Sequence, residues 1–475
     1  MDVKRSLAWL GAAQLLSFTL QFAASVVLAR HLSLREAGIY AAALAVAGVL
    51  ALIQTLGLQA LIVREEELTD EVSATAFTVN ALISLLLAAA LLAISAAGGR
   101  WLGDPGVGRV LRAVAVVPLF AIFAFLPSAI LERHGRFREI AVATTAGSVA
   151  GAVATMWLVT QGFGYMSAAY AQWATGLVAA IAINLLGFRH ASLRVGFSAW
   201  RRVAEFGFQM LAVTGINQAS TRLSELVLAR FLGLPALGLF SRASSLNGLL
   251  WTNIHLLVGR VMLVDFAGLH RGGASLRPRY LQTVEIVTAL LWPVFAGLAV
   301  LAPPFVQMIY GPRWVPAAAP LALLALSSLV QVAITMTWEL FAATGELRAQ
   351  TRIEFIRSLL ALAAFVGGCL VSLEAAAAAR VADALFALAL YRPHLDRMTG
   401  TRTADFWPIY ARSALLTLVA CAPAAALMVW RGWSAATPLP LVLASVAAGG
   451  GLWVAALMAT RHPLIAELRV RRRRA

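Results

Sequence analysis

Ionisable side chains inside long apolar stretches are the residues of this sequence whose type and spacing could do chemistry. Arg222 and Glu225 lie three residues apart in one such stretch, so on a helix they share a face and can neutralise each other. An arginine at the bilayer centre costs about 2.5–3.5 kcal/mol on insertion scales, so it turns toward protein or water. In a hydrated cavity, a guanidinium binds phosphate groups through charge-assisted hydrogen bonds. We expect this pair to line such a cavity, and a purely structural ion pair is the alternative.

Polar residues continue the stripe around this pair, and the pattern recurs 200 residues earlier. The corresponding positions are Gln14, Ser17, Gln21 and Ser25 in the first copy and Thr214, Asn217, Thr221 and Glu225 in the second. At about 100° per residue, the four positions of each copy lie on one narrow face of a helix. We predict that the cavity is also lined by Gln14, Gln21, Asn217, Gln218 and Thr221. Packing by small polar residues is the alternative.

The next apolar stretch carries a second candidate face. Arg242, Asn253 and Arg260 are separated by 11 and 7 residues, close to whole numbers of helical turns, so they project from one side. We expect these three residues to line the same cavity. The alternative for each arginine is that it extends to the nearer membrane surface, because long basic side chains snorkel from helix ends into water.

The other ionisable residues of the apolar stretches are interpreted as structural or solvated. Arg380 and Asp383 are three residues apart, which indicates a structural pair on one helix. Four further residues are expected to be solvated at cytoplasmic helix ends: Glu285, Glu339, Glu354 and Arg357.

The sequence contains no motif of a catalytic or metal site. Its two cysteines, Cys369 and Cys421, lie in separate apolar stretches, which indicates packing residues and no disulfide framework. A phosphate-binding glycine loop, a metalloprotease motif and paired cysteines are all missing from the sequence. We therefore expect no enzyme activity, no metal and no cofactor.

Membrane-spanning helices must position these side chains. Of the 475 residues, 61% are hydrophobic and 13% are charged, whereas an average soluble protein has about 25% charged residues. A bilayer core is crossed by roughly 20 apolar residues per helix. The windows of that length are 7–29, 38–62, 76–97, 110–131, 140–160, 164–187, 206–229, 236–262, 281–302, 317–342, 353–372, 375–391, 409–430 and 439–459. The sequence thus predicts an all-α, polytopic membrane protein with about 14 transmembrane helices.

The positive charge of the chain is mainly a topology signal. The formal net charge is +16, and 24 of the 38 Lys and Arg residues fall in segments on the N-terminal side of the membrane, against 8 on the other side. Cytoplasmic segments carry the excess of basic residues, so both termini are expected in the cytoplasm. The basic run at 469–474 directly follows a predicted helix, where it favours anionic lipid over nucleic acid.

An internal repeat organises the predicted helices. Residues 27–38 read VLARHLSLREAG and residues 227–238 read VLARFLGLPALG, with seven of twelve positions identical at an offset of 200. Copies with an even number of helices have the same orientation and are related by an axis along the membrane normal. We predict a six-helix bundle over residues 1–190, a second over residues 191–400, and two added helices with a basic tail over residues 401–475.

Four segments carry motifs of a known family. They are VVLARHLSLREAGIYAAALAVAGVLALIQTLGLQALIVRE (26–65), ERHGRFRE (132–139), LGLPALGLFSRASSL (232–246) and PPFVQMIYGPRWVPAAAPLALLAL (303–326). In these segments the chain resembles the oligosaccharide flippases of the polysaccharide-export (Wzx-like) branch of the multidrug/oligosaccharidyl-lipid/polysaccharide exporter superfamily. The resemblance implies two six-helix bundles around a central cavity, followed by two C-terminal helices.

The resemblance also implies a function. Such flippases move a polyprenyl-pyrophosphate-linked oligosaccharide, the repeat unit of an exopolysaccharide, capsule or O-antigen, to the outer leaflet of the bacterial inner membrane. Alternating access driven by a proton or sodium gradient is implied, with glycan polymerase or export proteins as possible partners. In our hypothesis Arg222 binds the pyrophosphate, and protonation of Glu225 releases Arg222 to couple an ion to transport.

Two other functions remain open at this point. An ion-coupled multidrug or metabolite extruder of the same superfamily would use an essential carboxylate, such as Glu225 or Asp383. A membrane glycosyltransferase or polymerase is disfavoured, because the longest predicted outer loop, at about 98–109, is too short to hold a catalytic domain.

Overall fold

A computed structural model of the chain shows a helical protein, without strands in the part of the chain that it describes. The backbone is described for residues 3–65, 68–101, 103–187 and 194–464. Side chains are described at these positions apart from 3–15, 55, 97–101, 208–214, 217, 252–261 and 264. Each of the fourteen predicted windows falls on helical structure, which confirms the predicted fold class.

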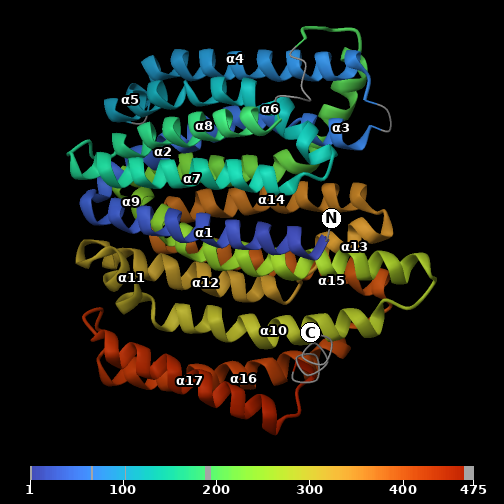
Figure 1. Cartoon of the computed structure of the whole chain (residues 1–475). Helices are drawn as coiled ribbons and strands as arrows, with labels where there is room; N and C mark the ends of the chain where they lie inside the picture. Colours follow the sequence, from blue (N-terminus) through green and yellow to red (C-terminus); the bar gives the residue numbers. More distant parts are fainter. Residues whose placement is uncertain (1–2, 66–67, 102, 188–193, 465–475) are drawn as a thin grey trace. The chain divides into compact units, whose positions relative to one another are not determined.

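The first of two compact units, Met1–Gly238, contains the predicted windows one to seven. Its helices are α1 (Val3–His31), α2 (Leu34–Leu50), η1 (Ala51–Thr55), α3 (Leu58–Arg64), α4 (Asp70–Trp101), α5 (Pro105–Val114), α6 (Val117–Arg133), α7 (Phe137–Thr160), α8 (Met166–Gly187) and the first part of α9 (Trp200–Arg271). Within this unit, α7 packs against α1 and α8, and α6 packs against α4 and α8, with the long helices side by side (Figure 1).

The second compact unit is Leu239–Ala475. After the rest of α9, its helices are α10 (Arg277–Val300), α11 (Ala302–Tyr310), η3 (Pro312–Ala317), α12 (Ala318–Val332), α13 (Thr337–Thr344), α14 (Leu347–Cys369), α15 (Leu373–Thr399), α16 (Thr403–Trp430) and α17 (Leu439–Ala459). In this unit α15 packs against α12 and α14, while α10 packs against α12 and α16 (Figure 1). The helix α17 packs against α16.

The two repeat motifs begin their second helix at corresponding positions. Ser33 is the N-cap of α2, and its hydroxyl accepts a hydrogen bond from the backbone N–H of Glu36, whose carboxylate accepts one from the backbone N–H of Ser33. In α9 the helix is interrupted 200 residues later at Gly233, whose φ of 86° is non-helical. Pro235 then stands in the first turn after the interruption, where its missing N–H costs no hydrogen bond. Different sequences therefore start a helix at the same place in both copies.

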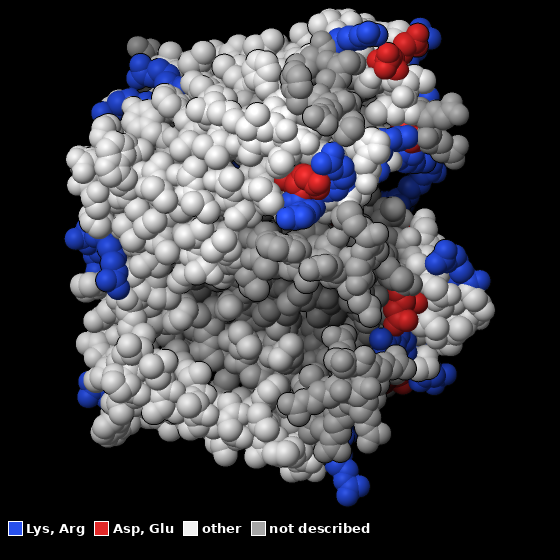
Figure 2. Space-filling model, viewed as in Figure 1, with Lys and Arg blue, Asp and Glu red and all other residues white. Residues whose placement is uncertain are grey.

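The surface is that of a protein surrounded by lipid. Leu86, Leu185 and Leu418 have exposed fractions of 68%, 79% and 69%, which would be unfavourable in water but suits hydrocarbon. In Figure 2 the charged side chains form a few separate groups with wide uncharged areas between them. Within the described residues, ten helical stretches are long and apolar enough to span a membrane.

Candidate functional site

The Arg222 and Glu225 side chains form the predicted ion pair on α9. The Nη1 atom of Arg222 lies 3.0 Å from Oε2 of Glu225, and the two side chains keep 36% and 20% of their surface exposed. Residues three apart on a helix are neighbours on its surface, so the helix itself brings the two groups together. The guanidinium remains partly open, and its other N–H groups can meet a further anion.

The polar residues predicted around this pair are only partly described. The side chains of Gln218 and Thr221 are exposed on α9, on the turn that precedes Arg222 and Glu225. Gln21 is exposed on α1, and its amide donates to the Ser148 hydroxyl of α7 at 3.5 Å. The side chains of Gln14, Asn217, Asn253 and Arg260 lie outside the described residues.

Arg242, the other described arginine of the predicted cavity, lies among aromatic rings of the second unit. Its guanidinium carbon is 5.9 Å from the ring centre of Tyr310 and 5.9 Å from that of Trp314. Both rings are almost fully buried, at 2% and 0% exposure. A cation over an aromatic face is stabilised by about 0.5–2 kcal/mol, so these rings hold the Arg242 side chain in place. Arg242 thus belongs to the second unit, whereas Arg222 belongs to the first.

A buried ionic network joins α14 to α15, and the prediction for its members was wrong. Arg357 donates to both carboxylate oxygens of Asp383 at 2.8 Å and to both oxygens of Glu354 at 2.5 and 3.1 Å. The Tyr391 hydroxyl also donates to Glu354, at 2.6 Å. The Glu354, Arg357 and Asp383 side chains keep only 20%, 15% and 7% of their surface exposed. Glu354 and Arg357 are thus not solvated, because α15 covers this face of α14.

The partner predicted for Asp383 was also wrong. Asp383 pairs with Arg357 on the neighbouring helix, whereas the Arg380 guanidinium lies 4.5 Å from the ring centre of Phe365. Glu339, expected to be solvated, is 3% exposed in α13. The sequence spacing finds neighbours on one helix, but it cannot show which helix packs alongside.

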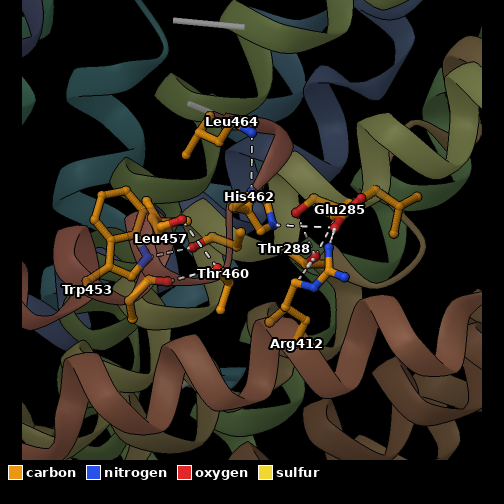
Figure 3. Close-up of polar contacts among 12 residues, drawn as sticks. Glu285, Thr288, Arg412, Trp453, Leu457, Thr460, His462 and Leu464 are labelled. Carbon is orange, nitrogen blue, oxygen red and sulfur yellow. Dashed lines mark hydrogen bonds and ion pairs between the residues drawn. The ribbon is translucent and has the colours of Figure 1, made fainter. Parts of the chain in front are cut away.

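A further polar cluster lies where α10, α16 and the segment after α17 meet. Glu285, also expected to be solvated, keeps 14% of its side chain exposed and accepts a hydrogen bond from Arg412 at 2.5 Å. The fully buried His462 ring points toward the same carboxylate, with Nε2 3.7 Å from Oε1 (Figure 3). The backbone N–H of Leu464 donates to Nδ1 of His462, so the neutral ring carries its proton on Nε2. No sequence pattern predicts this cluster, because its members are far apart along the chain.

We expect the protein to lose stability in acid through His462. Burial lowers the pKa of this imidazole below its ordinary value of about 6.5; Glu285 opposes the shift and Arg412 adds to it. The unfolded ring binds a proton more readily than the folded one. The contribution of the buried neutral ring to the free energy of unfolding is therefore complete above the unfolded pKa and is lost as pH falls below it. Thermal unfolding in detergent should show a decline of the midpoint below pH 6.5 that is smaller in His462→Asn. Parallel pH profiles of the two proteins would contradict this role.

Arg392 is another cation that the structure buries. It lies inside α15 with 7% exposure, and its guanidinium carbon is 3.9 Å from the ring centre of Phe406. Its Nη2 donates to the carbonyl of Ala333, directly after the end of α12, and to the Tyr410 hydroxyl. A cation at a helix C-terminus compensates the unpaired carbonyls there. Arg392 therefore stabilises the interruption between α12 and α13.

The described residues include no group of three or more His, Cys, Asp and Glu side chains placed to hold a metal ion. Cys369 and Cys421 are free thiols, as predicted. The arginine, amide and hydroxyl side chains of the described arrangement can bind anionic and hydroxyl groups.

Comparison with known proteins identifies the relatives of this chain. A family model described as polysaccharide biosynthesis protein matches residues 27–319. The succinoglycan biosynthesis transport protein ExoT of Rhizobium meliloti is 28% identical over 327 residues, which are 68% of this chain and 66% of ExoT. The lipopolysaccharide biosynthesis protein WzxC of Escherichia coli is 22% identical over 318 residues, 64% of this chain and 63% of WzxC. Each match thus spans just under two thirds of the relative's own length.

Solved structures share the fold over a larger part of the chain. The lipid II flippase MurJ in an inward closed conformation superposes with a TM-score of 0.79 at 13% identity, covering 96% of this chain and 99% of MurJ. An inward-facing multidrug resistance MATE transporter of the MOP superfamily has a TM-score of 0.63 at 17% identity, covering 82% of this chain and 96% of the transporter. At these identities the likeness establishes the fold, which is that of a multi-pass membrane protein.

Proposed function

This chain belongs to the family of polysaccharide biosynthesis proteins, and from this premise we propose that it flips a polyprenyl-pyrophosphate-linked oligosaccharide across the bacterial inner membrane. The observation that carries the proposal is a partly exposed guanidinium, that of Arg222, in the long apolar helix α9. A cation at that position is costly in a membrane unless an anion or water meets it. The transported pyrophosphate supplies such an anion. The names of ExoT and WzxC, a transport protein and a lipopolysaccharide biosynthesis protein, support the same class of substrate.

In the proposed mechanism the polar head of the substrate enters a hydrated cavity while the prenyl tail stays in lipid. Arg222 binds the pyrophosphate, and Gln218 and Thr221 on the preceding turn offer hydrogen bonds to sugar hydroxyls. We extend this lining to Arg242 and Gln21 and to the residues whose side chains are not described: Gln14, Asn217, Asn253 and Arg260. In this mechanism the lining binds and releases its substrate without forming or breaking a covalent bond. The proposed function is therefore that of a transporter and not of an enzyme.

Alternating access between two parallel repeats would move the substrate. We propose the bundles 1–190 and 191–400, with 401–475 as an added helix pair, and both termini in the cytoplasm. The interruptions at Ser33 and Gly233, 200 residues apart, support this repeat. A proton or sodium gradient would drive the transport. Protonation of Glu225 would break its ion pair with Arg222 and free the guanidinium for the pyrophosphate.

Replacing Arg222 or Arg242 by alanine is expected to abolish or strongly reduce polysaccharide export. Losing one charge-assisted hydrogen bond of about 1.5–3 kcal/mol weakens binding about tenfold to a hundredfold. The measurement is complementation of a deletion strain at equal protein level in the membrane, with Arg431→Ala, an exposed residue beyond the end of α16, as control. Accumulation of the lipid-linked oligosaccharide on the cytoplasmic side should accompany the defect. Intact export in both variants would contradict the cationic site.

A multidrug extruder of the same superfamily is the second candidate, supported by the shared fold of the MATE transporters. The two carboxylates proposed for that role are each paired with an arginine, Glu225 with Arg222 and Asp383 with Arg357. This pairing favours the flippase, because an ionised carboxylate already neutralised by an arginine attracts a cationic drug only weakly. Dye resistance conferred by the chain on a sensitive host would instead support the extruder.

A further inference from the structure

The stem of Arg222 lies against a glycine of another helix. A Cβ atom placed on Gly48 of α2 would lie 2.6 Å from Nε, 2.7 Å from Cδ and 3.1 Å from Cγ of Arg222. Real Cβ atoms essentially never approach other heavy atoms within 3.0 Å. The Arg222 side chain therefore occupies the space that any larger residue at position 48 would fill. This close approach is possible because glycine has no side chain.

Two contacts together fix the place of the guanidinium. The Glu225 carboxylate holds its Nη1 atom at 3.0 Å from within α9, and Gly48 of α2 leaves room for the stem. A side chain whose stem is already fixed loses less conformational entropy when its head binds a ligand. The Gly48 contact thus keeps the Arg222 stem in one place when protonation of Glu225 frees the head for an anion.

The internal repeat offers a natural comparison for this contact. The residue 200 positions after Gly48 is Gly248, so both copies carry a glycine at this place. The residue 200 positions before Arg222 is Phe22, so the cation occurs in one copy alone. A Cβ atom on Gly248 would meet no heavy atom of the described residues within 4 Å. The glycine recurs in both copies, but its contact with a cation does not.

We propose that Gly48 is a positioning residue for Arg222, which sets where the guanidinium meets the pyrophosphate of the transported lipid. This inference rests on the proposed function, since it assumes that Arg222 binds that group. Gly48 acts through Arg222 and makes no contact of its own with the substrate. An alanine at position 48 displaces the flexible Arg222 side chain, so the fold of α2 and α9 is preserved while the guanidinium leaves the place where it meets the pyrophosphate.

The test is a double-mutant cycle on ligand affinity, with polyprenyl pyrophosphate as the probe and the purified full chain in detergent. We expect Gly48→Ala to raise the apparent Kd about fivefold and Arg222→Ala to raise it about tenfold or more. In the Arg222→Ala background, Gly48→Ala should change the Kd by less than about twofold, because the residue through which it acts is gone. Gly248→Ala is the matched control and should bind as the parent protein does.

Two results would overturn the inference, and they can be told apart. If Arg222→Ala weakens binding but Gly48→Ala adds its full effect to it, Gly48 acts through packing and not through Arg222, while the proposed function stands. If Gly48→Ala alone leaves the Kd unchanged, the inference also fails while the proposed function stands. If Arg222→Ala itself leaves the Kd unchanged, the cationic site fails together with the inference. Equal unfolding midpoints of Gly48→Ala and Gly248→Ala show that lost affinity is not lost folding.

Discussion

Replacing Arg357 by methionine is expected to lower the free energy of unfolding by about 3–5 kcal/mol, the cost of breaking a buried ion pair by removing one partner. Methionine keeps most of the apolar stem but leaves the carboxylates of Glu354 and Asp383 without their shared cation. Both carboxylates are mostly buried between α14 and α15, where water cannot replace the lost hydrogen bonds. The measurement is the thermal unfolding midpoint of the purified protein in detergent, with the yield of folded protein from membranes as a second readout.

A charge-balanced variant separates the ionic effect from lost packing. The triple change Glu354→Gln, Arg357→Met and Asp383→Asn removes both negative charges together with the cation. Replacing a whole buried ionic group by neutral residues is often close to neutral, so the triple variant should recover most of the lost stability. A single variant as stable as the parent protein, or a triple variant no better than the single one, would contradict this account.

The membrane helices could be predicted from the sequence because each has its own hydrophobic run. Their interruptions were harder to predict. The window 110–131 is divided between α5 and α6, and the window 317–342 between α12 and α13. In the second case Met336 has a φ of 62°, and the Arg392 side chain donates a hydrogen bond to the Ala333 carbonyl. No local sequence pattern predicts either feature. The windows 206–229 and 236–262 lie on the two sides of the interruption of α9 at Gly233, as their separation in the sequence predicts.

The candidate site likewise contains contacts within one helix, which the sequence predicts, and contacts between helices, which it does not. The Arg222–Glu225 pair could be predicted because it is formed by residues three apart on one helix. The network of Arg357 with Asp383 could not, because its partners are 26 residues apart and meet only after α15 has packed on α14. The same local reading that found the first pair gave Asp383 the wrong partner, Arg380. Spacing along a helix thus identifies candidate pairs, and packing decides among them.

The repeat was visible in the sequence, but the contact that it creates was not. Gly38 and Gly238 form one of the seven identical pairs of the repeat, and each approaches the helix that carries the other. A Cβ atom on Gly38 would overlap the carbonyl oxygen of Leu234, and one on Gly238 would overlap that of Leu34. Leu34 and Leu234 are themselves repeat mates. The two copies of the motif therefore pack against each other through equivalent backbone atoms, at the starts of α2 and of the second part of α9.

Gly38→Ala is accordingly expected to destabilise the protein by about 3 kcal/mol, at the upper end of the usual cost of overpacking. Alanine normally favours a helix over glycine by about 1 kcal/mol, but this gain is smaller than the cost of separating two backbones. The added methyl group would meet a carbonyl oxygen, which cannot rotate away as a side chain can. Thermal unfolding of the purified protein measures the effect, and Gly238→Ala should behave alike.

The control for this prediction is Gly367→Ala in α14, where an added Cβ atom would lie more than 4 Å from every heavy atom in the described part of the chain. That variant should equal the parent protein or exceed it by up to about 1 kcal/mol, since it gains helix propensity without a clash. If Gly38→Ala instead proves as stable as Gly367→Ala, the close approach at Leu234 is not needed for the fold. The change in stability is therefore expected to differ in sign between Gly38→Ala and Gly367→Ala. That difference decides whether both copies of the repeat need a glycine at this position for their backbone contact.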